Sequence, residues 1–415
     1  MDSSILLKIA KKYKTPVYVY DEERIRKNFR DYLLAFRSRY PKTKVYYALK
    51  ANTNLAILRL LRQEGACADV VSGGELKAAL KAGFDGKDII YSNNAKTIEE
   101  INQAIKSGAI LNIDSMDELN RIHEIAKTKN KKTPISFRVN PSIDPKTHPK
   151  ISTGMKDSKF GIHIENNLAF KAYRFAAELE TVEIKGVHMH IGSQITDIKP
   201  FLEATDKLME FVKKLEAELE IRLEYIDIGG GLGINYEGGD VPTPDELAAE
   251  LVQVLERWSH RTGYEPQLWL EPGRYVVGNA GILLCEAQSV KETPYKNYIN
   301  LDCGFNTLLR PAMYGSYHKI ANLSAKENNR NYDVVGNICE SGDILGSNRS
   351  LPETKAGDIL AIYDVGAYGF SMSSQYNSRP RPPEVLVWGH SAELIRERED
   401  LNDLFNKQNI PDDLL

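Results

Sequence analysis

Cysteine is scarce in this chain of 415 residues. The four cysteines are Cys67, Cys285, Cys303 and Cys339, and they lie far apart without forming a C-x-x-C pair. This spacing argues against a disulfide framework and against a zinc site built from cysteines. We therefore expect a reducing, cytoplasmic location.

Long apolar runs and blocks of like charge are also missing. No apolar run reaches the roughly 18 residues that a membrane helix needs, and the first residues lack the apolar core of a secretory signal. The net charge is −3, so the chain has no excess of positive charge that would attract the phosphate backbone of a nucleic acid. With 42% hydrophobic and 27% charged residues, we expect a soluble globular protein that binds neither membranes nor nucleic acids.

Between about residues 21 and 275, β-rich runs alternate with amphipathic stretches. In these stretches apolar residues recur every three or four positions, as they do on one face of a helix. The β-rich runs cover residues 44–50, 67–72, 88–93, 109–115, 134–141, 184–193, 223–231 and 266–274. Eight evenly spaced strands with intervening helices predict an α/β fold, a closed (β/α)8 barrel of the TIM type. An open doubly wound sheet is the less favoured alternative.

The pattern changes after residue 275. Short β-rich segments there are separated by Gly, Pro and Asn, which predicts an antiparallel all-β domain, either a barrel or a sandwich. Only the last twenty-odd residues return to a helical pattern, and the segment TPVYVYD (15–21) is expected to join the β-rich sheet. We place the barrel at residues 26–275 and assign residues 1–25 together with 276–415 to the β-rich domain.

Catalytic side chains of a (β/α)8 barrel gather where its strands end. The predicted ends carry Lys50, Asp69, Asp114, Arg138, His188, His190 and the run Glu271-Pro272-Gly273-Arg274. Glycines 229–231 follow the seventh strand, a common phosphate position in such barrels, and their backbone N–H groups can converge on an anion. Gly273 and Arg274 complete this predicted phosphate site.

Lys50 is the candidate nucleophile at this end of the barrel. Loss of water and neighbouring charges can lower the pKa of a lysine until its amine attacks an aldehyde. A phosphate site and an aldehyde-binding lysine together predict pyridoxal 5′-phosphate, with Glu271 beside the ring nitrogen. An acidic partner keeps the pyridine protonated, which favours bond-breaking such as decarboxylation.

The same residues allow other interpretations. Lys50 can be an ordinary solvated lysine, and the glycine run can be a flexible turn. His188 and His190 lie two apart on one strand, so they can share a divalent ion in a metal-dependent hydrolase, or one ring can stack on an aromatic cofactor. Because the other strand ends supply no third histidine, we expect no metal.

Seven motifs, in order along the chain, resemble those of the diaminopimelate decarboxylases. They are YYALKAN, HMHIGSQ, GGGLG, EPGR, LLRPAMY, CESGD and GAYGFSMSSQYNSRPRP. These pyridoxal-phosphate enzymes share the fold group of alanine racemase and ornithine decarboxylase, and the resemblance runs from about Pro16 to Trp388. It implies decarboxylation of meso-2,6-diaminopimelate at its D-centre to L-lysine and carbon dioxide, the last step of lysine biosynthesis. It also implies a homodimer with shared active sites.

The resemblance implies a role for each motif residue. Lys50 corresponds to the lysine that binds the cofactor covalently, and Cys339 to a catalytic cysteine that reaches the site from the second subunit. The implied cofactor ligands are Lys50, Asp69, His190, Ser193, Gly230, Gly231, Glu271, Gly273, Arg274 and Tyr368. The implied substrate ligands are Arg274, Arg310, Tyr314, Glu340 and Tyr368.

The pair of arginines in these motifs supports a dicarboxylic substrate. A guanidinium grips a carboxylate through two parallel hydrogen bonds, and ornithine has no distal carboxylate for Arg274 and Arg310 to hold. An ornithine, arginine or carboxynorspermidine decarboxylase remains the main alternative. A catalytically dead relative is disfavoured because the chain keeps Lys50, Glu271 and Cys339. One departure is Cys303, which stands where relatives often have alanine.

Overall fold

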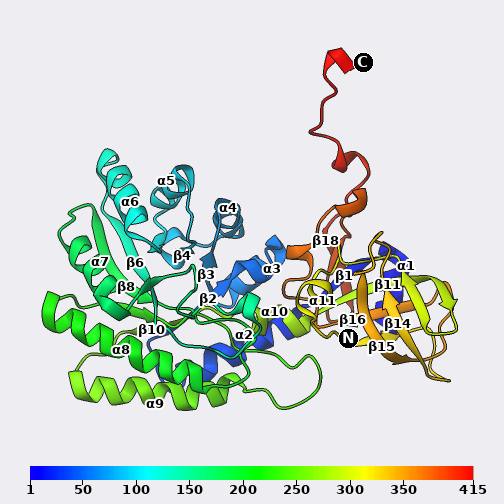
Figure 1. Cartoon of the computed structure of the whole chain (residues 1–415), viewed down its shortest axis with the longest axis horizontal. Helices are drawn as coiled ribbons and strands as arrows, with labels where there is room; N and C mark the ends of the chain where they lie inside the picture. The colour runs from blue at the N-terminus through cyan, green and yellow to red at the C-terminus, as the bar shows by residue number, and fades with distance from the viewer. Residues whose placement is uncertain (415) are drawn as a thin grey trace. The chain divides into compact units, whose positions relative to one another are not determined.

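We describe the protein from a computed structural model that defines residues 1–414 (Figure 1). The chain divides into two compact units. One unit, the barrel unit, contains Arg26–Asn235 and Gly239–Val276. The other, the β-rich unit, contains Met1–Ile25, Tyr236–Gly238 and the chain from Val277 onward.

Eight parallel strands of the barrel unit close into a ring, so the predicted TIM-type barrel is confirmed. The ring closes where β10 pairs with β2, with Leu270 opposite Val45. The two-residue β7 (Ile162–His163) pairs only with the end of β6. The ring strands are β2 (Thr43–Ala48), β3 (Cys67–Val70), β4 (Ile89–Ser92), β5 (Ile110–Ile113), β6 (Thr133–Asn140), β8 (Val182–His188), β9 (Tyr225–Asp227) and β10 (Gln267–Leu270).

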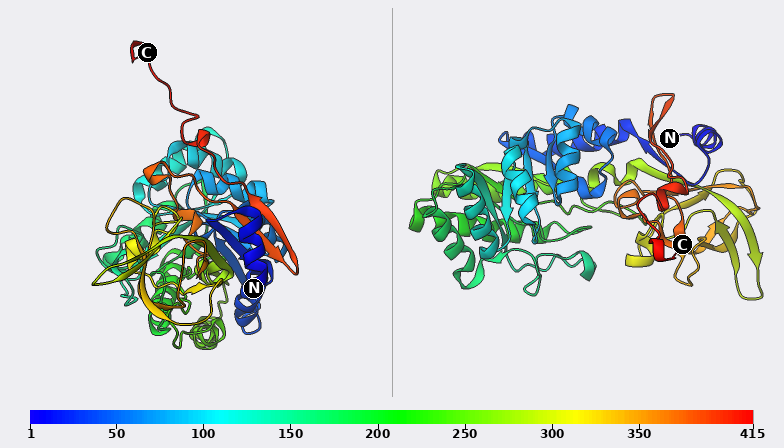
Figure 2. Two further views of the ribbon diagram at one scale, coloured as in Figure 1. Left: turned by 90° about the vertical axis from the view of Figure 1, so that its right-hand side faces the viewer. Right: turned by 90° about the horizontal axis from the view of Figure 1, so that it is seen from above.

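Helices connect successive strands and lie outside the ring (Figures 1 and 2). The local sequence explains their limits. In α5, Thr97 and Glu100 form a capping box at the start, and Gly108 ends the helix with a left-handed φ of 80°. The helices are α2 (Glu22–Arg37), α3 (Leu55–Gln63), α4 (Gly73–Ala82), α5 (Ile98–Ser107), α6 (Met116–Thr128), α7 (Leu168–Ala177), α8 (Lys199–Leu219), α9 (Pro244–Thr262) and α10 (Arg274–Val277).

The β-rich unit is a mainly antiparallel sheet. The TPVYVYD segment joins it as β1, which lies between β11 and β17, as the sequence predicted. Its strands are β1 (Val17–Asp21), β11 (Gly281–Glu292), β12 (Asn297–Leu301), β13 (Ile320–Asn322), β14 (Arg330–Val335), β15 (Ile344–Leu351), β16 (Ile359–Tyr363), β17 (Glu384–Trp388) and β18 (Ser391–Arg396).

Two strand pairs and two helical segments of this unit differ from the expectation. β1 with β17 and β12 with β14 are parallel, which the long connections between these strands permit. Helix α1 (Ser3–Tyr13) packs Leu6 and Ile9 against the sheet. The final residues form only short 3-10 turns at Asn402–Leu404 and Asp412–Leu414, so the expected helical pattern was wrong there. Within residues 1–414, no helix has both the length and the apolar character needed to span a membrane.

Candidate active site

The carboxyl ends of the barrel strands carry the lysine that the sequence singled out. Strand β2 ends at Ala48, and the following 3-10 turn (Leu49–Ala51) presents Lys50, whose side chain is 38% exposed. Lys50 Nζ lies 3.5 Å from Oδ2 of Asp69, which is fully buried in β3. The amine is therefore held at a fixed point of the barrel end while part of it stays open to a ligand.

A cluster of three buried titratable groups lies at the ends of β8, β9 and β10. His188 Nε2 lies 3.0 Å from Glu271 Oε2, and ligand atoms of His188, Asp227 and Glu271 all lie within 4.8 Å of one another. Burial, reinforced by the charge of Glu271, raises the pKa of Asp227 well above its usual range. Burial acts on Glu271 in the same direction, but His188 and Lys50 outweigh it and lower the pKa of Glu271 to about 2. Glu271 is thus the ionised carboxylate, and Asp227 keeps its proton.

Asp69 is the third buried carboxyl group of this region. Burial, followed by the charge of Glu271, raises the pKa of Asp69 to about 8. Concentrating the negative charge on Glu271 avoids three buried anions side by side. Glu271 Oε2 lies 3.0 Å from His188 Nε2, and among the described residues the buried Oε1 has no hydrogen-bond partner, so this oxygen can accept a donor from a ligand.

The predicted glycine run packs closely against the strand ends. The N–H of Gly229 donates to Asp227 Oδ1 at 2.8 Å, and that of Gly230 donates to His190 Nδ1 at 3.2 Å. A Cβ at Gly230 would lie 2.0 Å from the backbone oxygen of Glu271. At Gly231, with φ of 118°, it would lie 2.3 Å from the backbone oxygen of Gly192. No larger residue fits at either position without moving the backbone.

The other predicted phosphate ligands of the barrel unit come from the same end of the ring. Arg274 begins α10, is 4% exposed and donates from Nη2 to Ser193 Oγ at 2.9 Å. Gly273 lies directly against the lysine turn, because a Cβ there would be 3.1 Å from the Cβ atoms of both Ala48 and Ala51. Ser193 and Arg274 therefore contact each other, and Gly273 packs against the turn that carries Lys50.

His190 follows β8 and has an uncharged ring. Desolvation lowers its pKa well below the ordinary value, and the positive charges of Lys50 and Arg138 add to this effect. Its backbone oxygen accepts hydrogen bonds from Thr153 Oγ1 at 2.8 Å and from Arg138 Nη2 at 3.4 Å. A neutral imidazole held in this way suits stacking on an aromatic ring.

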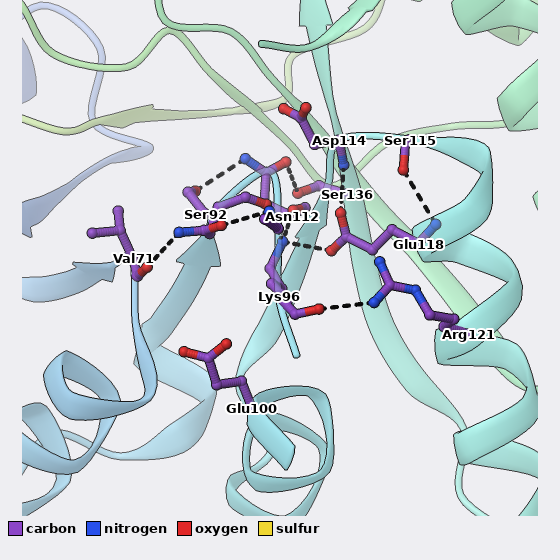
Figure 3. Close-up of polar contacts among 12 residues, drawn as sticks. Val71, Ser92, Lys96, Glu100, Asn112, Asp114, Ser115, Glu118, Arg121 and Ser136 are labelled. Atoms are coloured by element: carbon purple, nitrogen blue, oxygen red, sulfur yellow. Dashed lines mark hydrogen bonds and ion pairs between the residues drawn. The ribbon is translucent and has the colours of Figure 1, made fainter. Parts of the chain in front are cut away.

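A second lysine near the strand ends, Lys96, was not predicted from the sequence. Its side chain is fully buried, and its Nζ lies 2.5 Å from Oε1 of the buried Glu118. The ammonium also donates to the backbone oxygens of Asn93 and Asn112, each at 2.7 Å. Lys96, Asn112 and Glu118 are labelled in Figure 3. Its position four residues after the end of β4, among polar residues, was the signal that could have found it.

The pair of Lys96 and Glu118 fixes the loops that follow β4 and β5. Glu118 Oε2 accepts the N–H of Asp114 at 3.0 Å, and Asp114 Oδ1 accepts the N–H of Gly161 at 2.9 Å. Asn112 links to Ser92 and Ser136 through its side-chain amide, each at 3.0 Å (Figure 3). These contacts form a continuous polar network across three adjacent strands of the ring.

The remaining predicted residues lie in the β-rich unit. Arg310 begins α11 (Arg310–Tyr314), is 4% exposed and donates from Nη2 to Ser316 Oγ at 3.1 Å. Its guanidinium lies 5.2 Å from the centre of the Tyr236 ring and 5.8 Å from that of Tyr314. Tyr368 has a left-handed backbone conformation, with φ of 58°.

Cys339 and Glu340 are exposed in the turn before β15. The N–H of Cys339 donates to Asn377 Oδ1 at 2.9 Å, and Tyr376 donates its hydroxyl hydrogen to Glu340. Backbone and side-chain hydrogen bonds therefore hold this turn in place, while both residues stay exposed. Their roles, like those of the other candidate residues, stay predictions.

Comparison with known proteins identifies the family. Residues 23–278 match the model of the pyridoxal binding domain of pyridoxal-dependent decarboxylases. Over 409 residues, the chain is 46% identical to a diaminopimelate decarboxylase of Archaeoglobus fulgidus, covering 98% of this chain and 96% of that relative. The chain belongs to the diaminopimelate decarboxylase family.

Solved structures of diaminopimelate decarboxylases share the complete fold. The enzyme of Methanocaldococcus jannaschii, in complex with L-lysine, superposes with a TM-score of 0.94 at 45% identity, over 99% of this chain and 95% of that one. The enzyme of Helicobacter pylori, also with L-lysine, gives a TM-score of 0.91 at 39% identity, over 97% and 98% of the two chains.

Pyridoxal phosphate is the cofactor of this decarboxylase family, and the barrel residues fit it. Lys50 supplies a partly open amine, Glu271 supplies a buried ionised carboxylate, and Gly230 and Gly231 occupy strand-end positions where no Cβ fits. The cofactor accounts for this set of groups better than the metal-dependent alternative that His188 and His190 had suggested.

Proposed function

We propose that this chain decarboxylates meso-2,6-diaminopimelate at its D-centre and releases L-lysine and carbon dioxide, the last step of lysine biosynthesis in the cytoplasm. The observation that carries the proposal is the full-length match to diaminopimelate decarboxylases, at 46% identity over 98% of the chain. The position of Lys50 and Glu271 at the strand ends supports it independently of the comparison.

The bound cofactor supplies an electron sink for the pair of electrons left when carbon dioxide departs. In our assignment the amine of Lys50 would hold the cofactor through its aldehyde. Glu271, ionised in its buried position, keeps the ring nitrogen protonated. Asp69 adds a polar group beside the lysine, and the neutral ring of His190 would pack against the cofactor ring.

The phosphate and the substrate are assigned to separate sets of residues that share one arginine. The proposed phosphate ligands are Ser193, Gly230, Gly231, Gly273, Arg274 and Tyr368. The proposed substrate ligands are Arg274, Arg310, Tyr314, Glu340 and Tyr368. The arginines hold the distal carboxylate, since guanidinium groups bind carboxylates through two hydrogen bonds, and Glu340 takes the distal ammonium. This grip fixes the far end of the substrate and so orients the bond to be broken.

We further propose that Cys339 returns a proton to the α-carbon, and that it does so from the second subunit of a homodimer. In support, Cys339 and Glu340 are both exposed in an ordered turn. An exposed thiol and carboxylate on adjacent residues are available to a second copy of the chain.

A substrate panel tests the proposed function. Purified protein loaded with pyridoxal phosphate is given meso-diaminopimelate, L-ornithine, L-arginine or carboxynorspermidine, and both carbon dioxide and the amine product are measured. We expect turnover of meso-diaminopimelate alone, with L-lysine as the product. A kcat/KM for ornithine or arginine comparable to that for meso-diaminopimelate would contradict the proposed substrate. It would not affect the assignment of the chain to its family.

A further inference from the structure

Two of the four cysteines meet inside the β-rich unit. The sulfur atoms of Cys285 and Cys303 lie 2.7 Å apart, and the residues are 0% and 1% exposed. Cys285 belongs to β11, and Cys303 follows the end of β12. Residues so far apart in the sequence gave no signal of this contact before the sheet was known.

The strand register explains the contact. Ala287 lies opposite Leu301, so two residues further along the antiparallel pair Cys285 lies opposite Cys303. Between these pairs, the N–H of Asp302 donates to the backbone oxygen of Glu286 at 3.1 Å, and the N–H of Glu286 donates to Asp302 Oδ1 at 2.9 Å. Because narrow and wide pairs alternate, the cysteines occupy a position without mutual backbone hydrogen bonds, where side chains approach most closely.

A metal ion does not account for this cluster, although Asp302 lies near both sulfurs. Two thiolates on one tetrahedral zinc ion, each about 2.3 Å from the metal, stand about 3.8 Å apart. The observed sulfur separation of 2.7 Å is too short for that arrangement. The cluster also offers three ligands, whereas a closed structural zinc site has four.

We propose that Cys285 and Cys303 form a modification site in which a disulfide closes across β11 and β12. The oxidant is a small-molecule disulfide such as oxidised glutathione. One cysteine thiolate attacks it, which releases one thiol and leaves a mixed disulfide; the second cysteine then attacks the cysteine sulfur of that mixed disulfide and releases the second thiol. Two protons and two electrons leave the protein, and the oxidant is reduced to two thiols.

Burial decides when this reaction occurs. It raises the pKa of both thiols, that of Cys285 well above the usual range, so the reactive thiolate is scarce in the folded sheet. The bond therefore forms while the unit folds or while the two strands open locally. Once formed, it is shielded from reducing agents by the same burial.

Closing this link reduces the number of conformations open to the unfolded chain between the two cysteines, which are 18 residues apart. For a loop of this size in a unit of this length, the chain-entropy model predicts that the melting temperature of the β-rich unit rises by roughly 6–12 °C. The reduced and oxidised forms are therefore distinguishable without measuring turnover.

Peptide mapping tests the proposal directly. The full-length protein is unfolded, refolded with oxidised or reduced glutathione, alkylated and digested with trypsin. Cleavage after Lys291 and Lys296 separates the peptide 275–291, which holds Cys285, from the peptide 297–319, which holds Cys303. We expect these two peptides to be joined only in the oxidised sample, and melting curves of the same samples to differ as stated.

Two variants complete the test. Cys303→Ala should abolish both the joined peptides and the redox dependence of melting, whereas Cys67→Ala, which removes a buried cysteine of the barrel unit, should leave both intact. Free thiols at both positions after oxidative refolding, or a link from either one to a different cysteine, would overturn the proposal. Because no readout depends on catalysis, failure of the proposed enzymatic function would not affect this result.

Discussion

The buried pair of Lys96 and Glu118 gives a sharp prediction for the stability of the barrel. Replacing Lys96 with methionine keeps most of the side-chain volume but removes an ammonium that contacts one carboxylate and two backbone oxygens. The change leaves the 1% exposed Glu118 without its cation, an uncompensated charge in the interior.

The magnitude follows from opposing contributions. Hydrogen bonds to a charged group contribute about 1.5–3 kcal/mol each, while burial of the methionine side chain contributes at most about 1.5–3 kcal/mol in the opposite direction. Breaking one side of a buried ion pair typically costs about 3–5 kcal/mol, and we expect Lys96→Met to lower the free energy of unfolding by that amount. The double variant Lys96→Met with Glu118→Gln should be less destabilised than the sum of the single changes, because no charge is left unpaired.

Urea unfolding of the cofactor-free protein, followed by the fluorescence of Trp258 and Trp269 in the barrel unit, measures these differences. Lys27→Met is the matched control, since Lys27 forms an exposed ion pair with Asp31 and should cost no more than about 1 kcal/mol. If Lys96→Met behaved like Lys27→Met, or if the double variant were additive, the interior charge pair would not act as the structure indicates.

Three further predictions concern the candidate site. Arg310→Met should lower kcat/KM for meso-diaminopimelate about 100-fold or more, because it removes two charge-assisted hydrogen bonds to a carboxylate. Gly230→Ala should weaken pyridoxal phosphate binding at least about tenfold in a fluorescence titration, since the backbone must move to admit a Cβ that would lie 2.0 Å from the oxygen of Glu271. Asp69 has a folded pKa of about 8, above its unfolded value, so the folded state holds a proton that the unfolded state releases. Stability should therefore fall as the pH rises through this interval, and Asp69→Asn should flatten the decline in melting temperature of the cofactor-free protein.

Each of these predictions has a control. Arg330→Met alters an exposed arginine of the same unit and should leave kcat/KM unchanged. Gly74→Ala adds a methyl group to an exposed helical position where it meets only ordinary contacts, and should leave cofactor affinity unchanged. Equal kinetic losses in the two arginine variants, or equal affinities in the two alanine variants, would contradict the assignments. The same pH slope in wild type and Asp69→Asn would show that this carboxyl does not carry the linked proton.

The barrel could be predicted from the sequence because its strands and helices are local. Each strand is a short β-rich run, each helix repeats its apolar residues every three or four positions, and closure follows from their number and spacing. Parallel strands place all their carboxyl ends on one side, so Lys50, Asp69 and Glu271 could be assigned to one site before any contact was known.

Contacts between distant segments could not be predicted in this way. Lys96 reads as an ordinary polar loop residue until the chain brings Glu118 beside it, and Cys285 meets Cys303 only through the register of β11 and β12. The parallel pairing of β1 with β17 depends on how the two ends of the chain meet in one sheet, which no local pattern encodes.

The most direct test of the central claim is to identify the lysine that holds the cofactor. Protein loaded with pyridoxal phosphate is reduced with borohydride, digested and analysed by mass spectrometry, and Lys50→Ala is treated in parallel. We expect a pyridoxyl phosphate label on Lys50 in the wild type, and loss of both label and lysine production in the variant. A label on another lysine, or a Lys50→Ala protein that still releases lysine at the wild-type rate, would contradict it.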